Sequence, residues 1–145
     1  MTIVAWDGNT LAADRLHTFS GGLISEYKCK LYQWTNGWWS SCGYTKDGQL
    51  FQGWLETGKI KGKLGKDFEA LYSDADNIVY YVDRELIPEL APVPCAIGVA
   101  WKECLTLLKT GYNATEATIA LTKIHTGVGG KVDAVLIKKN NKRGR

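Results

Sequence analysis

The chain opens with Met1-Thr-Ile-Val-Ala-Trp-Asp-Gly-Asn-Thr-Leu-Ala-Ala-Asp-Arg15, and this stretch decides the fold. Ile3-Val4-Ala5-Trp6 is apolar and rich in β-branched residues, as β-strands are. Asp7-Gly8 is a frequent hairpin-turn dipeptide, and Leu11-Ala12-Ala13 resumes the apolar pattern before Asp14. The opening therefore predicts a β-hairpin in which the residue after Met1 stands at the start of a rigid strand.

Thr2 follows Met1 and is small enough for an aminopeptidase to expose it as the first residue. An N-terminal Thr carries a hydroxyl nucleophile together with its own base, the α-amine, which titrates at about pH 7.7–8.0. Near neutral pH this amine can accept the hydroxyl proton directly or through one water molecule. Many proteins begin Met-Thr by chance, so it is the predicted strand behind Thr2 that strengthens the hypothesis of a nucleophile.

Two charged residues complete the candidate set. Asp14 ends the opening hairpin, and Lys30 lies within the next predicted strand, over residues 28–34. A lysine close to an N-terminal Thr lowers the pKa of the hydroxyl through its positive charge, and an aspartate beside that lysine holds it in place. Thr2, Asp14 and Lys30 are therefore candidate catalytic residues.

At these residues the sequence resembles a known family. It is similar to the proteasome β-subunit and its bacterial relative HslV, and more closely to small HslV-like proteins of phages and bacteria, which begin Met-Thr-x-Ile-Ala-x-Asp-Gly-x-x-Leu-Ala-Ala-Asp. The resemblance runs nearly from end to end. Beyond the opening, it covers the region of Gly43, Gly53-Trp-Leu-Glu-Thr-Gly58, Ala96-Ile-Gly98, Gly111-Tyr-Asn-Ala-Thr-Glu-Ala117 and Gly129-Gly-Lys-Val-Asp-Ala-Val-Leu-Ile137.

This resemblance implies a fold, an activity and partners. The fold is α+β, the four-layer αββα sandwich of N-terminal-nucleophile hydrolases. The activity is that of a threonine peptidase acting on peptides or unfolded proteins, with Thr2 as nucleophile, Asp14 and Lys30 as its charge partners, and Gly43 as a candidate oxyanion-hole amide. No cofactor is implied. The expected partners are further copies of the chain, in a ring or an open assembly, and an AAA+ ATPase unfoldase.

Two departures from the family pattern favour an alternative function. Family members carry Gly-Ser-Gly where this chain has Gly98-Val99-Ala100, so the usual hydroxyl near the Thr amine is missing. Family members also place an Asp late in the chain, where residues 123–130 offer only His125 and Thr126. His125 is either a substitute polar partner or an ordinary loop histidine. The alternative is a catalytically inactive structural or binding subunit of the same fold, for which a phage is one of the sources considered.

Composition predicts one compact domain. The chain has 145 residues, of which 45% are hydrophobic and 23% charged, enough for one core and too few for two ordinary domains. We expect a domain over residues 1–137, without a signal peptide or membrane span, in the cytoplasm, or in the host cytoplasm for a phage protein. The four cysteines form no Cys-x-x-Cys pair and are expected to be buried thiols, not metal ligands.

The basic residues at the end of the sequence raise a third interpretation. Residues 138–145 supply five cations and no acid, and contribute much of the formal net charge of +3. Such a tail can bind the phosphates of a nucleic acid, with strong salt dependence, but a solvated, disordered tail is the commoner case. We therefore expect no nucleic-acid partner.

The remaining sequence predicts alternating strands and helices. Apolar spacing predicts helices over 47–59 and 97–109, and Asn113 followed by Glu116 predicts a capped helix through residue 123. We expect further strands at 38–44, 69–73, 78–82 and 132–137. The six tryptophans are expected mainly in the core, with Trp38 or Trp39 as a candidate contact to a neighbouring subunit.

Overall fold

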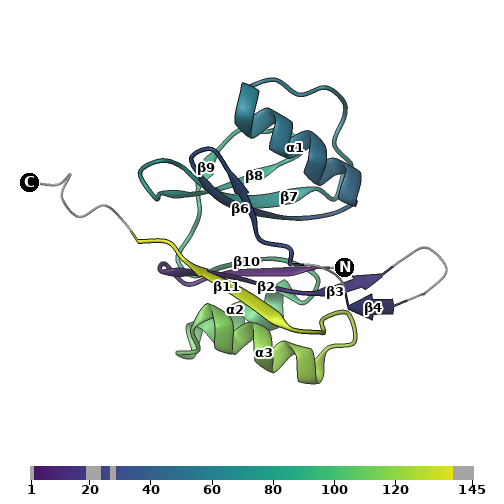
Figure 1. The fold of residues 1–145 in the computed structure, drawn as a ribbon. Coiled ribbons are helices and arrows are strands. Elements are labelled where there is room, and N and C mark those ends of the chain that lie inside the picture. Colours follow the sequence, from purple (N-terminus) through teal and green to yellow (C-terminus); the bar gives the residue numbers. More distant parts are fainter. Residues whose placement is uncertain (1, 19–23, 27–28, 139–145) are drawn as a thin grey trace, which may run out of the picture.

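The structure is a computed structural model that describes residues 2–18, 24–26 and 29–138. Two antiparallel sheets stack face to face. One helix covers the outer face of one sheet, and two helices cover the outer face of the other (Figure 1). This arrangement confirms the predicted α+β fold, with four layers in the order αββα.

The first sheet contains the predicted opening hairpin. Its strands lie in the order β10 (Cys95–Gly98), β1 (Ile3–Trp6), β2 (Thr10–Asp14) and β11 (Val132–Leu136). Oδ1 of Asp7 accepts the N–H groups of two residues in the β1–β2 turn, 2.8 Å from Asn9 and 2.7 Å from Thr10. The local turn chemistry therefore fixes the hairpin that carries Thr2.

The second sheet lies above the first and is larger. Its strands follow chain order, β5 (Tyr32–Trp34), β6 (Gly37–Cys42), β7 (Glu69–Ser73), β8 (Val79–Asp83) and β9 (Glu89–Leu90). A separate two-stranded ribbon pairs β3 (Leu16–Thr18) with β4 (Ile24–Glu26). This ribbon extends from the end of β2, and so leaves the sandwich beside the start of β1 (Figure 1).

Among the described residues, three helices close the outer faces. α1 (Thr45–Thr57) buries Phe51 against the second sheet and ends at Gly58, whose φ of +75° is the left-handed conformation of a C-cap. α2 (Trp101–Lys109) and α3 (Ala114–Ile124) pack on the first sheet. Asn113 and Glu116 form the predicted capping box at the start of α3.

Some predicted boundaries were wrong. Residues 97–98 belong to β10 and not to the following helix, because Ile97 pairs with Val4 across the sheet. Gly98 and Ala100 then adopt positive φ angles of +100° and +61°, which separate strand from helix. The strand predicted over 28–34 begins only at Tyr32; residues 29–31 are irregular, and residue 28 lies outside the described residues.

The core fills the space between the sheets and beneath the helices. Trp39 is only 4% exposed and stacks on Tyr32, so the interpretation of Trp39 as a subunit contact was wrong. Trp39 packs with Phe51 beneath α1, whereas Trp38 is half-buried against the inter-sheet core. Trp101 is the tryptophan with a large exposed fraction, 46%. Within the described ranges, no helix has the length and apolar character needed to cross a membrane.

Candidate active site

Thr2 is half-buried at the point where the two sheets approach each other. Its carbonyl oxygen accepts the N–H of Val99 at 3.0 Å, and Sγ of Cys42 lies 3.8 Å from the same oxygen. Gly98 allows this contact, since a Cβ at that position would lie 2.0 Å from the Thr2 carbonyl oxygen. Backbone contacts from β10 and β6 therefore fix the position of Thr2.

Asp14 lies at the end of β2, beside the start of β1, and its carboxylate is fully buried. Oδ1 accepts the N–H of Ile3 at 3.2 Å and also lies 3.2 Å from Nζ of Lys30. Oδ2 accepts the N–H of Gly129 at 3.1 Å. Asp14 therefore joins the strand that begins at Thr2, the lysine and the loop before β11 in one hydrogen-bonded unit.

Lys30 is 6% exposed and points its ammonium group toward the end of β2. Nζ donates to Asp14 and to the carbonyl oxygen of Leu16, while the Lys30 carbonyl accepts the hydroxyl of Ser40 at 2.8 Å. Burial lowers the pKa of Lys30, and the neighbouring Asp14 carboxylate opposes part of this effect. The lysine can therefore supply a positive charge in a site largely shielded from solvent.

Gly43 lies in the short connection between β6 and α1. It directly follows Cys42, whose sulfur contacts the Thr2 carbonyl, and its φ of +122° is a conformation that other residues rarely adopt. The residue is exposed. Gly43 therefore lies in an exposed connection, next to the cysteine whose sulfur contacts the Thr2 carbonyl.

Asp47 is a buried polar residue of this region that was missing from the sequence prediction. It lies in the first turn of α1, where Oδ2 accepts the N–H of Gly65 at 3.1 Å and stands 3.9 Å from the position a Cβ on Gly43 would take. Within the part of the chain that the structure describes, Oδ1 has no hydrogen-bond partner. An acid in a first helical turn is common, so no sequence signal set Asp47 apart.

The two departures from the family pattern have clear structural positions. The side chain of Val99 packs against the core beneath α2 and α3. His125 ends α3, and its Nδ1 accepts the N–H of Gly127 at 3.0 Å. This bond lies within the turn that follows α3, as expected for a loop histidine.

Burial keeps the four cysteine thiols in their protonated form. Burial raises the pKa values of the cysteine thiols, to about 11 for Cys95 and about 12 for Cys104, and that of Cys42 more strongly. Cys29, which is half-buried, is shifted in the same direction. The described residues contain no cluster of His, Cys, Asp and Glu side chains suited to a metal ion. Lys30 lies near Cys42 and Arg15 near Cys29, but in each case burial outweighs the effect of the cation and the net shift is upward.

No protein-family model and no curated protein matches the sequence. Solved structures match over almost the whole chain. BPH from Thiobacillus denitrificans aligns with a TM-score of 0.73 at 13% identity, and its complex with epoxomicin with 0.71 at 14%, each over 97% of this chain and 100% of the other. Eukaryotic HslV from Trypanosoma brucei aligns with a TM-score of 0.64 at 16% identity, over 94% of this chain and 98% of its own. These likenesses show that the chain has an HslV-like sandwich fold.

Proposed function

We propose that this chain is a threonine peptidase of the HslV and proteasome type, in which removal of Met1 exposes Thr2 as an N-terminal nucleophile. One observation carries the proposal. A buried Lys30–Asp14 ion pair, 3.2 Å between Nζ and Oδ1, is bonded through Asp14 to the N–H of Ile3, the residue directly after Thr2. A desolvated ion pair is costly unless well partnered, and here Asp14 bonds it to the strand that begins directly after Thr2, the proposed nucleophile.

The reaction would be acyl transfer to Thr2. As the Thr2 amine accepts the hydroxyl proton, Oγ attacks the peptide carbonyl, and the ammonium of Lys30 stabilises the negative charge that develops on Oγ. Asp14 keeps Lys30 in position, and the amide of Gly43 donates to the oxyanion, a type of contact that contributes about 3–4 kcal/mol per donor. The amine then protonates the leaving nitrogen, and a water molecule hydrolyses the Thr2 ester.

The partners of the site follow from the same family likeness. We infer that peptides or unfolded proteins are the substrates, that several copies of the chain assemble into a ring or open array, and that an AAA+ ATPase unfoldase delivers substrate. The cytoplasm, or the host cytoplasm for a phage-encoded protein, is the matching location. The fold supports these inferences because such assemblies are built from HslV-like subunits.

The direct test is hydrolysis of fluorogenic peptides by the full chain and its variants. Thr2→Ala removes the nucleophile and should abolish turnover, while Thr2→Ser keeps a hydroxyl and should retain part of it. Thr106→Ala changes an exposed threonine of α2 and serves as the matched control. Turnover by Thr2→Ala at the rate of the unaltered protein would contradict the proposal.

A second candidate function is that of an inactive structural or binding subunit. Val99 favours it, because an apolar side chain stands where the family places a hydroxyl beside the Thr amine. Substitution Val99→Ser separates the two functions. An active enzyme should turn over at least as fast with the hydroxyl restored, whereas a subunit that retains Met1 should stay inactive with either residue.

A further inference from the structure

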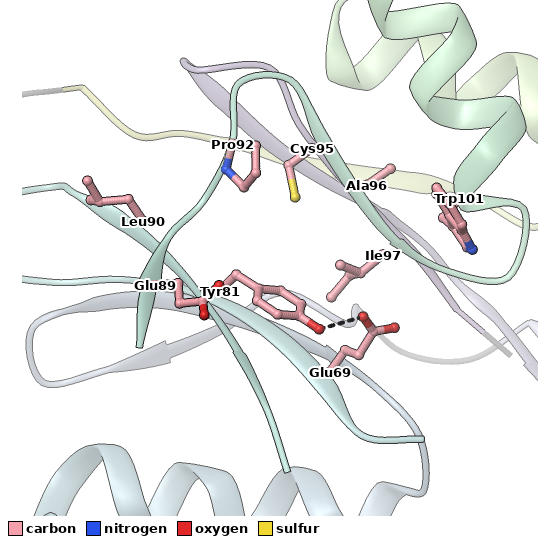
Figure 2. Close-up of a pocket in the computed structure, with 9 residues that line it drawn as sticks. All are labelled: Glu69, Tyr81, Glu89, Leu90, Pro92, Cys95, Ala96, Ile97 and Trp101. Carbon is pink, nitrogen blue, oxygen red and sulfur yellow. Dashed lines mark hydrogen bonds between the residues drawn. The ribbon is translucent and has the colours of Figure 1, made fainter. Parts of the chain in front are cut away.

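A cavity opens between the two sheets on one side of the sandwich. Its volume is about 370 Å³, which is enough for a long side chain of a bound polypeptide. Figure 2 shows it between β8 and β9 on one side and β10 on the other, with the start of α2 at its end. The described lining residues are Glu69, Tyr81, Glu89, Leu90, Pro92, Cys95, Ala96, Ile97 and Trp101.

This cavity flanks Thr2 on the side away from Lys30. Asp14 and its ion pair lie on the β2 side of β1, whereas the cavity is lined from β10, on the other side of β1. Ile97 directly precedes Gly98, which lies against the Thr2 carbonyl, and Glu69 pairs with Cys42, whose sulfur contacts that carbonyl. A polypeptide lying across Thr2 can therefore place a side chain here.

The lining combines apolar walls with negative charge. Oε2 of Glu69 accepts the hydroxyl of Tyr81 at 2.8 Å, which orients the carboxylate within the cavity (Figure 2). Burial and this bond raise the pKa of Tyr81, so the phenol stays protonated and continues to donate. Glu89 adds a second carboxylate from the exposed edge strand β9. Among the described residues that line the cavity, none is a lysine or an arginine.

An aromatic ring stands at the α2 end of the cavity. Trp101 is partly exposed there, and Nζ of Lys102 lies 5.5 Å from its ring centroid, so the ring already contacts one cation. Apolar walls, two carboxylates and an accessible indole together match a side chain that has an aliphatic stem and a cationic end.

We propose that this cavity binds a lysine or arginine side chain of the polypeptide substrate, with Glu69 and Glu89 contacting its cationic end. The inference rests on the proposed peptidase function, for which it names a substrate preference. The aliphatic stem packs on Ile97 and Leu90, so a basic residue at one fixed position relative to the cleaved bond is favoured over an uncharged residue of similar length.

The test uses an unfolded protein digested by the full chain, with cleavage products mapped by mass spectrometry. We expect Lys and Arg to be enriched at one position around the cleaved bonds. Glu69→Gln and Glu89→Gln remove one charge each, and Gln at position 69 can still accept the Tyr81 hydroxyl. Each should reduce the enrichment about tenfold, the size of one charge-assisted hydrogen bond. Glu85→Gln, an exposed acid paired with Arg84, is the matched control and should leave the enrichment unchanged.

A binding measurement separates this inference from the proposed function. Fluorescence anisotropy measures the affinity of the Thr2→Ala variant for two labelled peptides. One peptide has a central lysine and the other a central norleucine, which has a similar aliphatic stem without the charge. Preference for lysine that Glu89→Gln abolishes supports the cavity even if the unaltered protein cleaves nothing. Cleavage with no preference for lysine or arginine would overturn the inference, while the proposed peptidase function would remain supported. The inference would also be overturned if the chain did not bind the lysine peptide and Glu89→Gln changed the native mass of an assembly. That result would mean that a second copy of the chain covers the cavity.

Discussion

At the scale of single residues, Lys30 is the side chain whose ionisation matters most for the proposed chemistry. Its ammonium group is held by Asp14 and by the Leu16 carbonyl in a site with almost no solvent contact. Such a site strengthens the effect of the charge on a neighbouring hydroxyl, and it also favours loss of the proton. The same burial that makes Lys30 effective therefore limits the pH range in which it stays charged.

The pH dependence of kcat/KM follows from these two ionisations. Activity should rise as the Thr2 amine loses its proton, at about pH 7.7–8.0 for an ordinary α-amine, because the neutral amine is the base. It should fall at higher pH as Lys30 deprotonates, and this alkaline decline should begin below the usual range of a lysine because burial lowers the pKa. Lys30→Arg introduces a group that stays charged, so the decline in activity should move to higher pH. An alkaline limb unchanged by that substitution would contradict the role of Lys30.

At the scale of elements, the contact between β1 and β10 determines where Thr2 lies. Gly98 has a φ of +100°, and a Cβ there would lie 2.0 Å from the Thr2 carbonyl oxygen and 2.7 Å from Sγ of Cys42. Gly98→Ala should therefore lower the free energy of unfolding by about 2–4 kcal/mol and abolish turnover, because β1 must move. Urea denaturation measures the first effect, and peptide hydrolysis the second.

A glycine in an open position provides the control. Gly53 lies in the middle of α1 with no atom within 4 Å of the place a Cβ would take. Gly53→Ala should raise the free energy of unfolding by about 0.5–1 kcal/mol, since alanine loses less backbone entropy in a helix. Equal stability of Gly98→Ala and the unaltered protein would show that β10 does not fix the Thr2 strand.

The sequence predicted the elements that local chemistry determines. Asp7-Gly8 specifies the opening hairpin, and Asn113 with Glu116 starts α3; each of these signals lies within a few residues. The helix predicted over 47–59 is present as α1, shifted by two residues. β10 was missed because its four residues have no periodicity of their own and exist only through pairing with β1. The short strands β3, β4 and β9 were missed for the same reason, since pairing over a distance is not visible in a single stretch of sequence.

The candidate site could likewise be predicted only in part, because its contacts join residues that are distant in the sequence. Lys30 was predicted within a strand, but it lies in an irregular segment before β5. Only the folded chain brings its Nζ within 3.2 Å of Asp14 and bonds Asp14 to Ile3. The family resemblance, and not periodicity, supplied the pairing in advance. The cavity beside β10 could not be foreseen at all, because Glu69, Tyr81 and Ile97 come from three different strands.

At the scale of the whole molecule, the domain boundary predicted at residue 137 can be tested by truncation. Ile137 is 4% exposed, packs in the inter-sheet core, and donates its N–H to the Asn9 carbonyl at 2.7 Å. A chain ending at Lys138 should keep its free energy of unfolding. A chain ending at Leu136 should lose about 2–4 kcal/mol, from one buried aliphatic side chain and one hydrogen bond. Equal losses from both truncations, measured in urea, would place the boundary later in the chain.

The central claim concerns Thr2, which lies beside the β1–β10 contact within the sandwich and is proposed to use the charge of Lys30. The intact mass of the purified full chain, before and after treatment with an epoxyketone that reacts with N-terminal nucleophiles, tests its role most directly. We predict loss of Met1 and a single adduct that maps to Thr2 and is absent from Thr2→Ala. A chain that retains Met1, or a free Thr2 that never reacts, would contradict the proposed peptidase and identify the protein as an inactive subunit of the same fold.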